Sequence, residues 1–328
     1  MAWNHTKASK KRKQKKIMKA IFGKAAPLAT ALILLLCVLF GLVYANFEPV
    51  RDFVDGVGIF PTTTSIKVRP AIDPDGDEMA VHFIDVGQGD CTLFQTTKGA
   101  ILVDCSESQY GDDIIEYLNA QGITELEYFI ITHPDADHMG AAPYILEHIK
   151  VKNFVMNGQV KTTQFFTKTI TYLEEHTEIN VIVPEIGEIL EVGALQMNVL
   201  GPDPKLVEGD DWNEASIILH AVYGERAFLL TGDAEAEGEA YLVENFASII
   251  KCDVFSAGHH GSKSSNSMAL LNAAKPSYVV VSCGKDNDYG HPHKQSLDNF
   301  TAIGATVLRT DELGTIVFVT DGRKISVQ

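Results

Sequence analysis

The chain has 328 residues, of which 45% are hydrophobic, and this is enough for one large hydrophobic core or two modest ones. Its net charge of −16 is unevenly distributed: residues 1–24 hold nine basic side chains and no acidic one, which leaves 18 of the 27 Lys and Arg residues against all 43 Asp and Glu residues. This acidic balance excludes a protein that grips nucleic acid through a broad basic face, because phosphate binding depends on clustered Lys and Arg.

Residues 25–45 are uncharged, and as a helix this stretch is long enough to cross a hydrocarbon core about 30 Å thick. The basic residues 1–24 predict a cytoplasmic tail, which sends the remainder of the chain outward. We therefore predict a single-pass anchor in the cell membrane with an extracytoplasmic domain. A cleaved signal peptide is the alternative, since residues 43–45 (Val-Tyr-Ala) offer small side chains at a suitable cleavage position.

Residues 46–77 contain prolines and a threonine run without sustained periodicity, which indicates a linker with a short strand at 65–68. From residue 78 onward, strands alternate with helices and no repeat of fixed period occurs. We expect strands at 79–86, 91–97, 100–105, 128–132, 153–156, 180–183, 188–192, 195–200, 216–223, 227–232, 253–257, 278–282, 305–309 and 315–320. We expect helices at 112–120, 139–149, 164–176, 235–246, 267–273 and 296–303. The two similar halves predict an α/β fold over residues 78–328, an αββα sandwich of two packed sheets with helices outside.

Four potential metal ligands lie within six residues of one segment, namely His133, Asp135, Asp137 and His138. The segment follows an expected strand and precedes an expected helix, so we expect a loop at a sheet edge, where α/β proteins build their sites. Carboxylates gathered without counter-charge are unfavourable, and a divalent cation removes that cost. The mixture of His and Asp suits Zn²⁺, and also Mn²⁺ or Fe²⁺.

Three later clusters also follow expected strands. Asp233 comes directly after strand 227–232, where taken alone it is better explained as the N-cap of the helix at 235–246. His259 and His260 follow strand 253–257, and His291 lies in a later Gly-His-Pro-His turn. Taken alone, His259 and His260 fit a surface position as well as a ligand, and His291 is more simply a surface or turn residue. Their shared position at the carboxyl ends of strands favours one common site.

Other catalytic signatures are missing from the sequence. The four cysteines after residue 46 lack the spacing of a zinc site, so we expect buried thiols, with a disulfide between Cys91 and Cys105 as the alternative. No nucleophile elbow or dinucleotide fingerprint occurs. The segment 85–90 (DVGQGD) predicts a tight turn that brings Asp90 toward the site.

These motifs resemble those of a known family. Asp104, the 133–138 segment, Gly232-Asp233 and the 259–262 segment (HHGS) follow in the order of the metallo-β-lactamase fold. That family usually has a second histidine where this chain has Asp135. The Asp variant, together with DVGQGD, GDAE and GHHGS, resembles the C-terminal domain of the competence protein ComEC. The resemblance covers about residues 79–328 and rests on five separated motifs.

The resemblance implies a centre of two divalent metal ions, Zn or Mn. His133 and Asp135 would hold one ion, and Asp137 and His138 the other. The resemblance also implies that Asp233 would bridge the ions and that His259 would join the second one. Asp104 would orient ligands. Asp137 would also act as the catalytic base, and His260 would contact the substrate. Glu214 stands where an asparagine is usual and its segment brings no histidine, so a single-metal enzyme is the alternative.

The implied function is a membrane-anchored, extracytoplasmic, metal-dependent hydrolase, most simply a phosphodiesterase or nuclease. The resemblance implies DNA as the substrate and the DNA-uptake machinery as a partner, although a chain with one expected span cannot itself form the DNA channel. Hydrolysis of cell-wall phosphodiesters or other small esters is one alternative, and a non-catalytic binding module is another. Asp135 disfavours a true β-lactamase. The sequence leaves the oligomeric state open.

Overall fold

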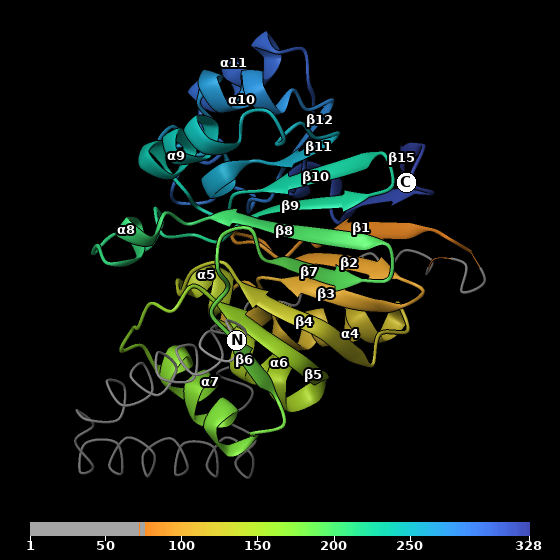
Figure 1. The fold of residues 1–328 in the computed structure, drawn as a ribbon, viewed down its shortest axis with the longest axis vertical. Coiled ribbons are helices and arrows are strands. Elements are labelled where there is room, and N and C mark those ends of the chain that lie inside the picture. Colours follow the sequence, from red (N-terminus) through yellow and green to blue (C-terminus); the bar gives the residue numbers. More distant parts are fainter. Residues whose placement is uncertain (1–71, 73–75) are drawn as a thin grey trace, which may run out of the picture. The chain divides into compact units, whose positions relative to one another are not determined.

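The computed structural model describes residue 72 and residues 76–328 (Figure 1). The predicted tail (1–24), the anchor (25–45) and the short strand at 65–68 lie outside these residues, and so does nearly all of the linker. Within the described part, no helix combines the length and apolarity needed to span a membrane. The first strand begins at Met79, one residue after the predicted start of the domain.

The first sheet has eight strands in the order β15-β14-β1-β2-β3-β4-β5-β6. Strands β15 to β3 along this order pair antiparallel, and β3 to β6 pair parallel. Their bounds are β1 Met79–Phe83, β2 Thr92–Thr96, β3 Gly99–Val103, β4 Glu125–Ile131, β5 Lys150–Met156, β6 Asn180–Ile182, β14 Ile316–Thr320 and β15 Ile325–Val327. The main helices on the outer face are α4 Gly111–Ala120, α6 Ala142–His148 and α7 Gln164–Glu175.

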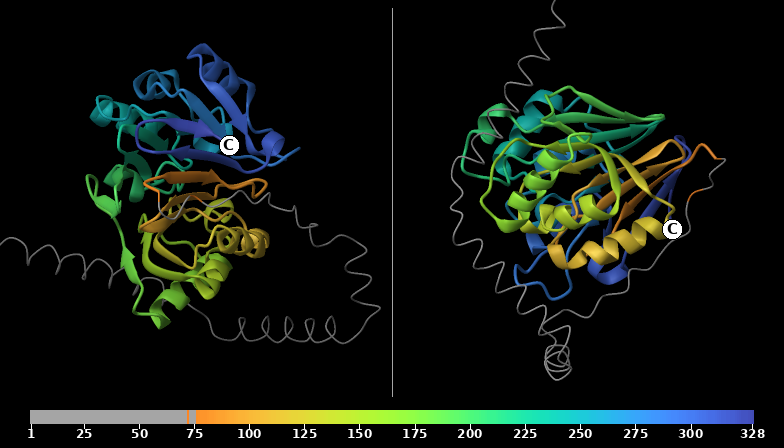
Figure 2. Two further views of the ribbon diagram at one scale, coloured as in Figure 1. Left: turned by 90° about the vertical axis from the view of Figure 1, so that its right-hand side faces the viewer. Right: turned by 90° about the horizontal axis from the view of Figure 1, so that it is seen from below.

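The second sheet has seven strands in the order β13-β12-β11-β10-β9-β8-β7, and β10 to β13 pair parallel. Their bounds are β7 Ile189–Val192, β8 Leu195–Gly201, β9 Ile218–Tyr223, β10 Arg226–Leu230, β11 Val254–Ser256, β12 Tyr278–Val281 and β13 Thr306–Arg309. The helices of this half are α9 Ala236–Phe246, α10 Met268–Ala274 and α11 Lys294–Ala302. They lie on the side of the stacked sheets opposite to α4, α6 and α7 (Figures 1 and 2).

The main core lies between the two sheets and draws buried side chains from both. Along β1, Met79, Val81 and Phe83 enter this core, whereas His82 points to the other face and bonds to Tyr117 of α4. This is the two-residue periodicity of a strand that is covered on both faces. A second core lies between the second sheet and helices α9 to α11. The predicted αββα sandwich is confirmed.

Most expected elements agree with the structure to within a few residues at each end, and the differences are short elements. Asp137 and His138 were expected on a loop but lie on the one-turn helix α5 (Ala136–Met139). The sequence pattern also missed β15 and the one-turn helices α8 (Pro204–Val207) and α12 (Thr310–Leu313), because elements of three or four residues are too short to show periodicity. All four cysteines of the described residues are free and buried, so the alternative of a Cys91–Cys105 disulfide is wrong.

Candidate metal centre

The segment after β4 carries two buried histidines. His133 and His138 have no exposed surface, and their ring centroids lie 4.1 Å apart. The amides of His138 and Met139 donate to the carbonyl of Asp135, and these bonds close the turn of α5. The turn therefore brings His138 back beside His133, which precedes it by five residues.

Asp104, at the end of β3, orients His138. Its carboxylate accepts the Thr132 amide at 2.8 Å, the Thr132 hydroxyl at 2.7 Å and Nδ1 of His138 at 2.8 Å. Because Nδ1 donates to Asp104, Nε2 of His138 keeps its lone pair for another partner, which is the usual arrangement behind a metal-binding histidine. The predicted orienting role of Asp104 fits this geometry.

Asp233 comes from the second sheet, just after β10. Gly232 has a φ of 52°, and a Cβ at this residue would lie 3.0 Å from the side chains of both Ser216 and Thr132. Glycine therefore permits the close approach of the two sheets at this position. The Ser216 hydroxyl accepts the Asp233 amide at 3.1 Å and lies 3.3 Å from Nδ1 of His133.

The carboxylate of Asp233 faces all four buried or half-buried imidazoles of the centre. Its Oδ1 lies 3.1 Å from Nε2 of His138, and its Oδ2 lies 3.9, 3.6 and 3.8 Å from Nε2 of His133, His259 and His260. The N-cap of α9 is Glu235. The alternative interpretation of Asp233 as the helix cap is therefore wrong.

His259 and His260 form a strained turn after β11. Their φ values are 50° and 53°, a left-handed conformation that non-glycine residues rarely adopt and that persists only where surrounding contacts enforce it. The Asn266 side chain supplies these contacts: its Oδ1 accepts the Gly258 amide at 2.9 Å, and its Nδ2 donates to the carbonyls of Gly258 and Ser262 at 2.9 and 3.1 Å.

His260 is fully buried between two aspartates. Its Nδ1 lies 3.1 Å from the Ser282 carbonyl and 3.3 Å from Asp90, and its Nε2 lies 3.3 Å from Asp137. The turn that was expected to bring Asp90 toward the site does so. His259 is half-buried, and its Nδ1 lies 3.1 Å from Glu235.

The donor set fits a cation. One ligand atom from each of Asp137, His138, Asp233 and His260 can be chosen so that all lie within 4.8 Å of one another. Nε2 of His133 is buried and has no hydrogen-bond partner, and Nε2 of His138 and Oδ1 of Asp233, which lie 3.1 Å apart, have no further partner. Imidazole nitrogens and carboxylate oxygens gathered in this way are explained by an ion that they would bind.

The charges of the cluster are strongly coupled. Burial acts to lower the pKa of His138 and of His260, but Asp233 and further carboxylates outweigh it and raise both pKa values well above the usual range. For His133 burial prevails, and the pKa falls well below the usual range. Burial acts to raise the pKa of Asp137, but the hydrogen bond with His260 outweighs it and lowers the pKa. A cation must therefore displace protons, so its binding should weaken as pH falls.

Asp135 and His291, which the sequence also singled out, lie outside this group of four, as do His133 and His259. Asp135 forms an ion pair with Lys161, whose Nζ lies 3.8 Å above the Trp212 ring. His291 is buried beside the histidine pair, with its ring centroid 5.4 Å from that of His259, and its Nδ1 has no hydrogen-bond partner. The assignments of Asp135 and His133 to a first metal and of His259 to a second stay predictions.

Glu214 has a role that the sequence did not indicate. Its carboxylate accepts the amides of Glu235, Glu237 and Gly238 at 3.1, 2.9 and 2.7 Å. It thus caps the start of α9 and holds the turn that carries Asp233, as a carboxylate does at the positive end of a helix. Only the departure from the expected Asn marked this residue, and that signal did not reveal a capping role.

The comparisons with known proteins agree with this geometry. Residues 84–285 match the profile of the Metallo-beta-lactamase superfamily, which is more than half of the chain. The chain belongs to this superfamily. The metallo-beta-lactamase fold protein YhfI from Bacillus subtilis has the same fold, with a TM-score of 0.50 and 13% identity over 74% of this chain and 100% of that protein.

The curated relatives are ComEC-like competence proteins, as the sequence motifs predicted. ComE operon protein 3 of Bacillus subtilis is 34% identical over 272 residues, which are 76% of this chain and 34% of that protein. Competence protein ComA of Neisseria gonorrhoeae is 30% identical over 258 residues, which are 77% of this chain and 34% of that protein. The chain therefore spans about a third of the length of these relatives.

Proposed function

We propose that this metal-dependent hydrolase is a phosphodiesterase that cleaves DNA and faces outward from a membrane anchor. The observation that carries the proposal is that ligand atoms of Asp137, His138, Asp233 and His260 lie within 4.8 Å of one another. A binding module without catalysis has no need for such a set. Relatives named as competence proteins support DNA as the substrate and DNA uptake as the process.

Divalent ions held by Asp137, His138, Asp233 and His260 would supply Lewis acidity and make water a better nucleophile near neutral pH. The chain itself supplies orientation and proton transfer. Asp104 fixes the tautomer of His138, and Ser282 and Asp90 hold His260. Asp137 has 24% of its side chain exposed, and its Oδ2 lies 3.3 Å from Nε2 of His260.

Asp137 is the residue best placed to take a proton from an attacking water. Its lowered pKa keeps it ionised, so it can accept a hydrogen bond and orient the water, but it also weakens the base, so a bound cation would have to acidify the water for the transfer. The deeper Asp233 is enclosed by imidazoles and has 4% of its side chain exposed, so it serves as a ligand. We assign the general base to Asp137 and the bridging ligand to Asp233.

The decisive experiment is elemental analysis of the purified chain together with a hydrolysis screen. The substrates are bis(p-nitrophenyl) phosphate and linear DNA, each with added Mn²⁺ or Zn²⁺. We expect bound metal and metal-dependent cleavage of both substrates. Bound metal without cleavage of any phosphodiester would contradict the proposed reaction, and cleavage of the small ester alone would contradict DNA as the substrate.

The proposed topology rests on the nine basic residues that precede an uncharged stretch of 21 residues. Protease added to intact cells should remove the domain that begins near residue 78, with any outer membrane made permeable. A cytoplasmic marker protein provides the control for cell integrity. Full protection of the domain in cells that remain intact would contradict an outward orientation.

A further inference from the structure

Two exposed aromatic side chains lie at the edge of the metal centre. Among the described residues, Trp212 and Tyr289 are the aromatic side chains that are largely open to solvent, at 39% and 65% exposure. Trp212 is linked to the centre through Lys161, which lies over its ring and pairs with Asp135. Tyr289 stacks on His291, with centroids 5.6 Å apart and planes inclined by 24°.

Tyr289 also lies close to the acidic side of the centre. The charge of Asp137 is the main cause of a raised pKa for its hydroxyl, followed by burial and by Glu107, Asp288 and Asp135. One face of the Tyr289 ring rests on His291, and its 65% exposure leaves the rest of the ring open. The imidazole of His291 is itself buried against the histidines of the centre and gives this ring a rigid support.

The charges around these two rings exclude one mode of strand binding. The groups that act on Tyr289 are carboxylates, and Lys161, the cation beside Trp212, is already paired with Asp135. Lys285 and Arg309 line the pocket beside His291, but phosphate contacts with the groups at the two rings cannot supply the affinity. Stacking of bases on aromatic rings can do so, and it tolerates every sequence because each base has a π face.

We infer that Tyr289 and Trp212 form a stacking platform for unpaired nucleobases, so that the centre acts on single-stranded nucleic acid. This inference rests on the proposed phosphodiesterase function and names its substrate class. A base that stacks on Tyr289 lies beside His291, which packs against His259 and His260 of the centre. A duplex cannot use the platform, because its base faces are already stacked on one another.

Binding without turnover tests this inference separately from hydrolysis. Fluorescence anisotropy with the full-length chain in EDTA compares a labelled oligothymidylate of about 12 nucleotides with an abasic strand of equal length and charge. We expect the strand with bases to bind about tenfold more tightly, and Tyr289→Ala to remove about tenfold of that affinity while leaving abasic binding unchanged. Tyr289→Phe should retain the affinity, since the ring and not the hydroxyl stacks.

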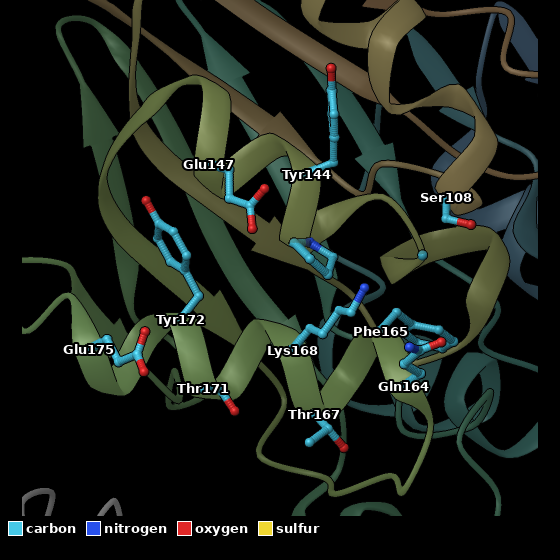
Figure 3. Close-up of a pocket in the computed structure, with 12 residues that line it drawn as sticks. Ser108, Tyr144, Glu147, Gln164, Phe165, Thr167, Lys168, Thr171, Tyr172 and Glu175 are labelled. Atoms are coloured by element: carbon cyan, nitrogen blue, oxygen red, sulfur yellow. The ribbon is translucent and has the colours of Figure 1, made fainter. Parts of the chain in front are cut away.

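Tyr172 provides a matched control. It also stacks on a histidine, His176, at 3.8 Å and 11°, but it lies on α7 beside the groove between α6 and α7, which contributes no residue to the metal cluster (Figure 3). Tyr172→Ala should bind both strands as the wild type does. Salt dependence gives a second readout: a strand held by stacking should lose little affinity with added salt, whereas each phosphate contact adds about 0.7 to the slope of log K against log salt.

The platform is overturned if the wild type binds the two strands equally or binds neither. It is also overturned if Tyr172→Ala and Tyr289→Ala lose the same affinity. The outcome is separable from that of the proposed reaction. Base-dependent binding without hydrolysis of any phosphodiester contradicts the reaction and keeps the platform. Hydrolysis of DNA without base-dependent binding keeps the reaction and overturns the platform.

Discussion

The two sides of the metal centre position their histidines by different means. On the side of β4, His133 and His138 lie on backbone of ordinary conformation and are contacted by the side chains of Ser216 and Asp104, and Asp104 itself has a left-handed φ of 58°. On the side of β11, His259 and His260 themselves have left-handed backbone, and Ser282 and Asp90 also contact the His260 ring. The left-handed backbone of the first side thus belongs to a residue that orients an imidazole, and that of the second side belongs to the histidines themselves.

Asp233 joins the two sides, since its carboxylate faces histidines from both. This difference predicts where a substitution that does not touch the imidazoles should still change metal binding. Loss of a contact on the β4 side frees one imidazole, whereas release of the β11 turn moves two histidines together. The following predictions test this comparison.

The largest effect should follow from the loss of the proposed base. Asp137→Ala should abolish phosphodiester hydrolysis while the fold survives, because the side chain is partly exposed and packs in no hydrophobic core. Turnover of bis(p-nitrophenyl) phosphate measures the loss, and circular dichroism checks the fold. If more than about a tenth of the activity remains, the residue does not serve as the base, since general-base catalysis contributes about 10²–10⁴-fold.

The next prediction concerns the residue that joins the two sides. Asp233→Ala should lose more metal than His133→Ala, because Asp233 is anionic and faces histidines of both sides, whereas His133 is neutral and belongs to one. Metal-to-protein ratios after identical dialysis decide between the two variants. Wild-type metal content in Asp233→Ala would contradict the bridging role.

The β11 turn should be sensitive to Asn266, which touches no imidazole. Asn266→Ala should weaken metal binding about tenfold to a hundredfold, the usual effect of an outer residue that orients ligands. It removes three hydrogen bonds to the turn. Asn245→Ala is the control, because Asn245 bonds only to Tyr241 of its own exposed helix face. If Asn266→Ala binds Zn²⁺ with wild-type affinity in a titration, the conformation of the turn does not depend on Asn266.

A buried histidine away from the centre should give the smallest effect. His82 bonds to Tyr117 and has no carboxylate partner, and burial lowers its pKa from 6.5 to about 4. The unfolded chain therefore takes up this proton first, so the free energy of unfolding falls as pH drops from 6.5 toward 4. We expect this residue to account for a loss of about 1–2 kcal/mol between pH 7 and pH 5.

Urea unfolding of the wild type and of His82→Gln at both pH values measures this contribution, since the non-titrating variant lacks it and all other groups cancel in the difference. Equal changes with pH in the two proteins would show that His82 does not titrate in this range. His138 differs from His82 in that Asp233 and Asp104 raise its pKa, so its protonation does not contribute to this loss.

Much of the fold could be predicted because its signals are local. The strands of the parallel pairs are short apolar runs, and α4, α7 and α9 have apolar faces at helical spacing, so their positions follow from the chain itself. The site residues could be predicted as a group for a related reason. Parallel strands end at the same edge of a sheet, so the ligands after β10 and β11 come together once their pairing is known. The ligands after β4 belong to the other sheet and join them only through the packing of the two sheets.

The tertiary structure alone decided which of these residues touch and what supports them. His260 meets Asp137 across 123 residues of chain, and Glu214 caps α9 from 24 residues away. The packing of the two sheets sets such contacts, and no local periodicity encodes it. The same holds for the pairing of Asp135 with Lys161 and for the left-handed turn at His259, which is held by hydrogen bonds with Asn266 and with the Gly232 carbonyl.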